Sequence, residues 1–146
     1  MSRLYPDRPF LAASVAVLRQ GRVLLAQRTG GAGAGLYSLP GGMVETGERL
    51  AETALRELVE ETGVVADQPR FVDTVEVIVR DDSGRVRNHA VVCVFAAIWR
   101  SGDGQTGPEA ADVRWVDPFA PGNLPMTDGL AAVLAKAARL MVEQDA

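Results

Sequence analysis

Residues 42–64 have the sequence GMVETGERLAETALRELVEETGV, and this stretch carries the strongest structural signal in the chain. Its apolar residues recur at intervals of three and four positions, which is the spacing of an amphipathic helix. At about 100° per residue, one broad face of such a helix collects them all: Ala51, Ala54, Leu55, Leu58 and Val59. Gly63 follows as a C-terminal stop. The sequence therefore predicts a helix that packs against a core and ends at Gly63.

Three carboxylates, Glu57, Glu60 and Glu61, fall on another face of this helix, roughly opposite to the apolar one. Like charges at these spacings cost an isolated helix about 0.2–0.5 kcal/mol per pair, and anions near a helix C-terminus oppose its dipole. Local stability therefore disfavours the arrangement, whereas a bound divalent cation would favour it. Mg²⁺ prefers oxygen ligands and usually bridges carboxylates to substrate phosphates. A solvated acidic face is the alternative, and the rest of the stretch decides against it.

The stretch matches the pattern G-x5-E-x7-R-E-U-x-E-E-x-G-U, where U is aliphatic, at every specified position. The matching residues are Gly42, Glu48, Arg56, Glu57, Leu58, Glu60, Glu61, Gly63 and Val64. This pattern is the signature of the Nudix hydrolases, and the chain resembles that family. Residues 22–28, 35–42 and 113–116 also resemble family strands and the lead-in to the signature, with Tyr37 where tryptophan is frequent. The resemblance implies an α/β/α sandwich, with a mixed β-sheet between helices.

The other predicted elements agree with this α/β fold class. Strands are predicted at residues 11–18, 23–27, 37–39, 68–80, 85–99 and 113–116. Tight turns are predicted at residues 19–22, 40–42 and 81–84. A last helix, capped by Thr127, carries an apolar stripe of core residues: Leu130, Val133, Leu134, Ala137, Leu140 and Met141. From the length of the chain we expect a single domain over residues 1–146.

Composition excludes several classes of partner. A net charge of −4 and a pI near 5.0 argue against a nucleic-acid-binding surface. The single cysteine, Cys93, lies in an apolar run, which predicts a buried, reduced residue and favours a cytoplasmic location. The N-terminus lacks the apolar core of a signal peptide, and no apolar run approaches membrane-spanning length. We therefore expect a soluble cytoplasmic protein that binds neither nucleic acid nor membranes.

The resemblance also implies the reaction and part of the site. Nudix enzymes use water and a divalent metal, Mg²⁺ or Mn²⁺ as a substitute, to hydrolyse a nucleoside diphosphate linked to another group. By resemblance, the metal ligands are Glu57, Glu60, Glu61 and the carbonyl of Gly41, while Glu60, Glu61 and Arg56 are catalytic. Arg56 is expected to pair with Glu52 or Glu60 and to orient the acids. Glu48, near the helix start, is expected to support them at most indirectly.

The general base is left open by the signature. Family members place it either within the signature or on a later loop, where Glu109 is the best candidate, with Asp103 and Asp112 behind it. Glu109 in that position could instead recognise a nucleobase. Arg28, at the end of its predicted strand, is a candidate phosphate contact or an ordinary surface arginine. The glycine-rich residues 29–35 lack the Gly-Lys-Ser/Thr ending of a Walker loop, so we interpret them as a simple connection.

Substrate selectivity must come from loops outside the signature, at residues 29–35, 101–112 and 118–125. These loops are rich in Gly, Pro and small residues, and the chain shows no basic cluster. Such loops suit a neutral ribose better than a third phosphate, which predicts ADP-ribose as substrate, with AMP and ribose 5-phosphate as products. The alternatives are a MutT-type nucleoside triphosphatase and a non-catalytic nucleotide-sensing module. Many family members dimerise, so a homodimer is one assembly that the resemblance allows.

Overall fold

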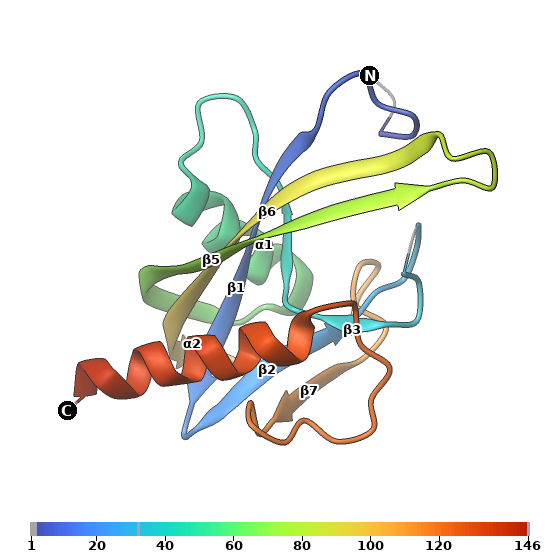
Figure 1. Cartoon of the computed structure of the whole chain (residues 1–146). Helices are drawn as coiled ribbons and strands as arrows, with labels where there is room; N and C mark the ends of the chain where they lie inside the picture. The colour runs from blue at the N-terminus through green and yellow to red at the C-terminus, as the bar shows by residue number, and fades with distance from the viewer. Residues whose placement is uncertain (1–2, 32, 146) are drawn as a thin grey trace.

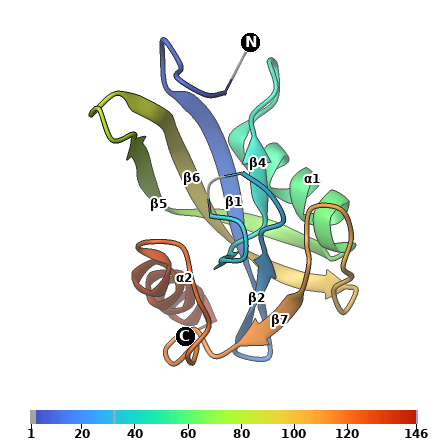
Figure 2. The same cartoon turned by 90° about the vertical axis from the view of Figure 1, so that its right-hand side faces the viewer.

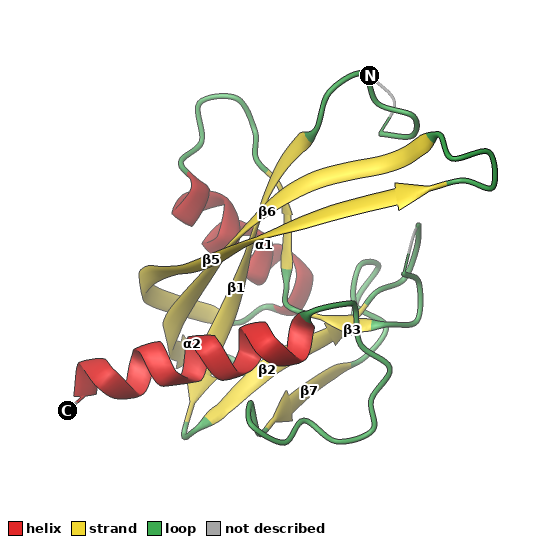
Figure 3. Cartoon of the chain, in the orientation of Figure 1, coloured by secondary structure: helices red, strands yellow, loops and turns green. Residues whose placement is uncertain are grey.

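One mixed β-sheet with a helix on each face forms the framework of the protein (Figure 1). The computed structural model describes residues 3–31 and 33–145. In chain order the elements are β1 (Phe10–Arg19), β2 (Arg22–Gln27), β3 (Tyr37–Ser38), β4 (Gly41–Met43), α1 (Leu50–Thr62), β5 (Val65–Arg80), β6 (Val86–Ser101), β7 (Val113–Val116) and α2 (Leu130–Asp145). Figure 3 shows the two helices and the sheet by type, and the predicted α/β/α sandwich is confirmed.

The strands are joined in the order β3-β2-β1-β6-β5, with β4 paired to β1 and β7 paired to β2. Strands β1 and β6 run parallel, from Phe10 opposite Ala90 to Leu18 opposite Ile98, and the other pairs are antiparallel. Strand β1 therefore lies at the centre of the sheet. It brings together β4, which precedes α1, and β6, which lies far away along the chain.

The two helices lie on opposite faces of the sheet (Figure 2). Side chains along the central strands point alternately to the two faces, so the apolar core is divided into one cluster under each helix. In β1, Val15 and Val17 pack with Leu58 of α1, whereas Ala16 packs with Leu134 of α2. The predicted stripe of α2 is confirmed as core, because five of its residues are buried and Leu140 packs against them. Cys93 is buried on the α1 side, as predicted.

Helix α1 differs from its prediction in which residues it buries. It ends as expected at Gly63, whose φ is +73° and whose N–H donates to the Val59 carbonyl at 2.9 Å. Val59, however, is 47% exposed, while Thr53 and Thr62 are fully buried. Thr62 satisfies its hydroxyl by donating to the Leu58 carbonyl at 2.7 Å. The buried face is thus centred on Ala54 and Leu58, and the acids flank it instead of lying opposite to it.

Three predicted boundaries are wrong. The turn expected at residues 40–42 gives way to strand β4, because Gly41–Met43 finds an antiparallel partner in β1. Helix α2 begins at Leu130, and Thr127 contributes its carbonyl, which accepts from the Leu130 N–H at 3.2 Å, in place of a side-chain cap. Strand β5 begins at Val65, because it continues its pairing with β6 up to Ser101. The turns at residues 19–22 and 81–84 are confirmed.

No helix in the described part of the chain combines the length and the apolar character that crossing a membrane requires.

Candidate active site

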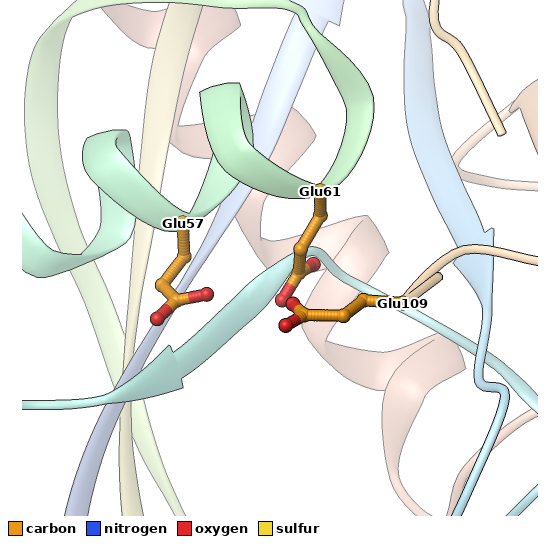
Figure 4. Close-up of side chains that lie close together, drawn as sticks. All are labelled: Glu57, Glu61 and Glu109. Atoms are coloured by element: carbon orange, nitrogen blue, oxygen red, sulfur yellow. The ribbon is translucent and has the colours of Figure 1, made fainter. Parts of the chain in front are cut away.

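Three glutamates meet beside helix α1 (Figure 4). Glu57 and Glu61 project from α1, and Glu109 reaches them from the loop between β6 and β7. Each offers a carboxylate oxygen, and these oxygens lie within 4.8 Å of one another. Glu57 and Glu61 share a side of the helix because they are four residues apart, about 40° around its axis. Tertiary structure therefore adds a third carboxylate to a pair that the helix already aligns.

The loop that carries Glu109 is held firmly against β2. The Ala111 N–H donates to the Gln27 carbonyl at 3.0 Å, and the Thr29 hydroxyl donates to the Pro108 carbonyl at 2.8 Å. Ala110, next to Glu109, is fully buried. Glu109 itself is exposed. Its backbone is thus anchored on both sides while its carboxylate remains open to solvent and to a ligand.

Two adjacent glycines let strand β4 pass between β1 and the acids. A Cβ at Gly41 would lie 2.4 Å from the Ala13 carbonyl oxygen, so this glycine allows close pairing with β1. A Cβ at Gly42 would lie 2.5–2.6 Å from the carboxyl carbon and Oε1 of Glu57. The Gly41 N–H also donates to Glu61 Oε2 at 3.3 Å. The glycine pair therefore makes room for one acid and holds another.

Arg56 connects the acids to the loop before the helix. Its Nη1 donates to Glu57 Oε1 at 2.9 Å and to Glu60 Oε2 at 3.1 Å, while its Nε and Nη2 grip the carboxylate of Glu48. Glu48 also accepts from the Thr53 hydroxyl at 2.7 Å. The predicted pair with Glu60 is present, the alternative with Glu52 is not formed, and Glu48 is the principal partner.

Glu60 is the predicted ligand that the structure keeps apart from the cluster. Its carboxylate binds Arg56, and its side chain is 55% exposed, compared with 14% for Glu57. The reason is its hydrogen bond with Arg56 one turn back, which directs the carboxylate away from Glu57 and Glu61. Glu60 therefore lies outside the group of three acids in this structure, and its role as a metal ligand stays a prediction. Glu60 instead neutralises the outer side of Arg56.

Crowding of carboxylates changes the protonation of the site. The pKa of Glu61 is raised from 4.5 to about 8, mainly because the side chain is withdrawn from water and because the negative charges of Glu57 and Glu109 lie close to it. Hydrogen bonds have the opposite effect on Glu48, because those from Arg56, Thr53 and the Glu45 N–H lower its pKa to about 2. Without a cation, Glu61 therefore retains its proton near neutral pH, while Glu48 stays ionised.

The donor set fits a hard divalent cation. With Mg²⁺–oxygen distances of about 2.1 Å, opposite ligand oxygens in an octahedral site are about 4.2 Å apart. Adjacent ligand oxygens are only about 3.0 Å apart. The three carboxylate oxygens lie within 4.8 Å of one another, so they would have to draw closer to share one ion. A cation would also replace the proton on Glu61, because metal ligands bind in their deprotonated form. Glu57 and Glu61 would hold it, and the Glu109 carboxylate lies beside them.

Asp103 and Asp112, the other candidates for the general base, each pair with an arginine. Asp103 forms an ion pair with Arg19 at 2.8 Å, and Asp112 pairs with Arg114 at 2.9 Å while accepting from the Tyr37 hydroxyl. Neither belongs to the group of acids that could share a cation. Of the two, only Asp112 touches β2, through its backbone carbonyl, which the Gln27 N–H binds at 2.8 Å.

Arg28 is exposed at the end of β2 and lines a cavity of about 450 Å³ together with Arg3 and Arg87. The expectation that the chain has no basic cluster is wrong at this cavity. No short-range signal could have revealed it, because the three arginines come from the N-terminal segment, from the end of β2 and from the start of β6. The loop at residues 29–35 is confirmed as an irregular connection, except that residue 32 lies outside the described part.

Comparison with known proteins agrees with the fold. The family model described as NUDIX domain matches residues 8–136, and the chain belongs to the Nudix hydrolases, a family of enzymes. The predicted resemblance is confirmed. A curated relative, the ADP-ribose pyrophosphatase of Methanocaldococcus jannaschii, is 30% identical over 115 residues, which make up 79% of this chain and 65% of the relative. The chain thus spans just under two thirds of that protein's length.

Two solved structures share the fold over most of both chains. The MutT NUDIX hydrolase from Burkholderia pseudomallei has a TM-score of 0.77 at 26% identity, covering 89% of this chain and 98% of its own. The NUDIX domain of Shewanella oneidensis NrtR, crystallised with ADP ribose, has a TM-score of 0.74 at 25% identity, covering 93% and 90%. The ADP ribose in the second structure is the ligand of the Shewanella domain.

Proposed function

We propose that this protein is a Mg²⁺-dependent pyrophosphohydrolase that cleaves a nucleoside diphosphate derivative at its pyrophosphate. The observation that carries this proposal is the meeting of Glu57, Glu61 and Glu109 beside the glycine pair of β4. A pyrophosphate is anionic, and a site with three carboxylates can accept it only with a cation between them. The bound cation would neutralise phosphate oxygens and lower the pKa of a coordinated water.

The chain's own residues supply the remaining tasks. Glu57 and Glu61 would hold the cation, and the carbonyl of Gly41 is proposed as a further ligand. Arg56 orients Glu57 through their hydrogen bond at 2.9 Å, and Glu60 helps to hold Arg56. Glu109 is exposed within the cluster, so its carboxylate can take a proton from water without leaving its anchored loop. Water adds to one phosphorus, the bridging oxygen leaves with the other phosphate, and two phosphate monoesters result.

ADP-ribose is the proposed substrate, with AMP and ribose 5-phosphate as products. The match to an archaeal ADP-ribose pyrophosphatase supports this choice, as does the similarity to a NUDIX domain crystallised with ADP ribose. The cytoplasmic location, the single domain over residues 1–146 and the homodimer accompany this proposal as predictions.

A nucleoside triphosphate is the second candidate, and the cavity lined by Arg3, Arg28 and Arg87 is the observation that favours it. Arginine binds phosphate through paired hydrogen bonds, so three arginines can accommodate more negative charge than a neutral ribose carries. This cavity removes one reason for preferring ADP-ribose, namely the expected lack of basic residues.

Kinetics on a matched panel separate the two candidates. We would compare kcat/KM for ADP-ribose, dATP, 8-oxo-dGTP and a dinucleoside polyphosphate with Mg²⁺, and identify the products by chromatography. Glu61→Gln, prepared in parallel, controls for contaminating phosphatases, because true activity should disappear with it. ADP-ribose is expected to give the highest value. A triphosphate that wins by tenfold, about 1.4 kcal/mol in transition-state binding, would establish the second candidate instead.

A further inference from the structure

Three positive charges gather around one cavity in a chain whose net charge is −4. The cavity, of about 450 Å³, is lined by Arg3, Leu4, Arg28, Gly30, Gly31, Arg87 and Asn88. None of these lining residues is acidic. Among the described residues, ion pairs engage Arg19, Arg56, Arg100 and Arg114, but none engages Arg3, Arg28 or Arg87. Their charge is therefore available to a ligand.

The N-terminal segment is fixed where it forms one wall of this cavity, beside the tip of the β5–β6 hairpin (Figure 1). The Tyr5 N–H donates to the Arg87 carbonyl at 2.8 Å, and the Tyr5 hydroxyl donates to Asp81 at 3.0 Å. The guanidinium of Arg85 stacks 4.3 Å above the Tyr5 ring. Tyr5 thus places Arg3 close to Arg87, although the two are far apart in the sequence.

The segment that carries Arg28 is hydrogen-bonded to the loop that carries Glu109. Arg28, Gly30 and Gly31 belong to the same short segment as Thr29, whose hydroxyl binds the carbonyl of Pro108 at 2.8 Å. Pro108 directly precedes Glu109. A substrate bound with its pyrophosphate at the three glutamates would have to extend along this segment to enter the arginine-lined cavity.

Asn88 adds a polar group with unused bonding capacity. It lines the cavity, and its Oδ1 is buried without a hydrogen-bond partner among the described residues. Buried polar atoms are rarely left unpaired in folded proteins, and such exceptions need an explanation. Its Oδ1 can accept from a hydroxyl group of a ligand, and a flip of the amide would instead present Nδ2 as a donor to a phosphate oxygen.

We propose that Arg3, Arg28 and Arg87 form a subsite for a phosphate group of the substrate that is not part of the hydrolysed pyrophosphate. This inference rests on the proposed function and deepens it by naming a chemical feature of the preferred substrate. The phosphate could be the third one of a nucleoside triphosphate, or a monoester on the ribose of a nucleoside diphosphate sugar. The shared chemistry is an additional phosphate anion held by guanidinium groups.

The test measures binding without catalysis. Dissociation constants are determined by calorimetry with Ca²⁺ in place of Mg²⁺, after chromatography has shown that no ligand is cleaved. Two matched ligand pairs are compared, ADP-ribose with its 2′-phosphate, and dADP with dATP. In each pair one phosphate is the difference. In at least one pair the extra phosphate should tighten binding to the wild-type protein by about tenfold or more, because hydrogen bonds between charged groups are among the strongest that proteins form. The pair that shows this gain identifies the source of the phosphate.

The gain should fall below about threefold in Arg87→Gln and in Arg3→Gln, since each variant removes one guanidinium of the proposed subsite. Arg139→Gln is the matched control. This arginine lies on α2 above the Phe119 ring, so the substitution removes the same charge at a place away from the cavity. Circular dichroism checks that each variant is folded. Equal binding within both pairs, or an equal loss of the gain in Arg139→Gln, would overturn the proposal.

The outcomes also separate this subsite from the proposed reaction. If the gain depends on Arg3 and Arg87 but no ligand is hydrolysed when Mg²⁺ is added, the subsite stands and the proposed reaction fails. If ADP-ribose is hydrolysed but the extra phosphate brings no gain, the subsite fails and the reaction stands.

Discussion

The guanidinium of Arg56 holds the carboxylate of Glu48 through two hydrogen bonds, from Nε to Oε2 at 2.6 Å and from Nη2 to Oε1 at 3.0 Å. Such a paired contact fixes the plane of the guanidinium. The same guanidinium then places the Glu57 carboxylate, 2.9 Å from Nη1. Glu48 therefore controls the geometry of an acid in the cluster without belonging to it.

Replacing Glu48 tests this control. Glu48→Gln should lower hydrolysis or metal affinity by about 10–100-fold, the usual effect of losing a residue that orients a ligand. The protein should remain folded, because Glu48 lies outside the two apolar clusters. Glu45→Gln is the control, since its carboxylate lies 4.0 Å from Arg56 and is 73% exposed. A titration of the rate with Mg²⁺ measures both variants, and equal behaviour of the two would contradict the role of Glu48.

Glu61 and Glu60 are expected to differ, although they are neighbours. Glu61→Gln should lose most hydrolysis at saturating Mg²⁺, because its carboxylate lies within the cluster. Glu60→Gln should retain considerably more, because its carboxylate points to Arg56 and is 55% exposed. Steady-state rates over a range of Mg²⁺ concentrations measure both. If the two variants lose activity equally, Glu60 must turn towards the cation in the working enzyme.

Glu109 is tested by separating kcat from KM. If its carboxylate takes the proton of the attacking water, Glu109→Gln should lower kcat by about 10²–10⁴ with little change in KM. A higher KM at constant kcat would instead indicate that Glu109 binds the nucleobase. An unchanged enzyme would return the role of base to the glutamates of α1.

Gly42→Ala should disturb the cluster through Glu57. The new Cβ would lie 2.5 Å from the carboxyl carbon of Glu57, so that side chain must move away from its place beside Glu61. We expect weaker metal binding, measured by calorimetry, with the fold retained. Gly107→Ala is the control, because a Cβ there meets no atom within 4 Å. Unaltered metal affinity in Gly42→Ala would show that Glu57 does not need this position.

The stability of the metal-free protein should depend on pH through Glu61. Its pKa is about 8 in the folded protein, compared with the ordinary glutamate value of 4.5 in the unfolded chain. Between these two pH values the folded state therefore binds more protons than the unfolded state. The free energy of unfolding should therefore fall as pH rises through this range. Urea denaturation in EDTA measures this slope, which should flatten in Glu61→Gln. Added Mg²⁺ should restore stability at the alkaline end, because it binds only the folded site. A slope that persists unchanged in the variant would assign it to other groups.

The sequence by itself determined the features that depend on neighbours along the chain. The period of apolar residues predicted α1 and α2, Gly63 predicted the end of α1, and the i, i+4 spacing of Glu57 and Glu61 aligned them. Backbone geometry alone relates residues within a few helical turns or across a tight turn, so short-range patterns suffice for these predictions.

Only the tertiary structure decided which distant groups meet. It brought Glu109 to the acids through the bonds of its loop to β2, and it made Glu48 the principal partner of Arg56. It also gathered Arg3, Arg28 and Arg87 around one cavity. The grouping of the arginines depends on the parallel register of β1 with β6 and on the hydrogen bonds of Tyr5 to the Arg87 carbonyl and to Asp81. The free energy that selects such contacts comes from burial and hydrogen bonding across the whole sheet. Short-range sequence patterns therefore could not predict which distant segments meet.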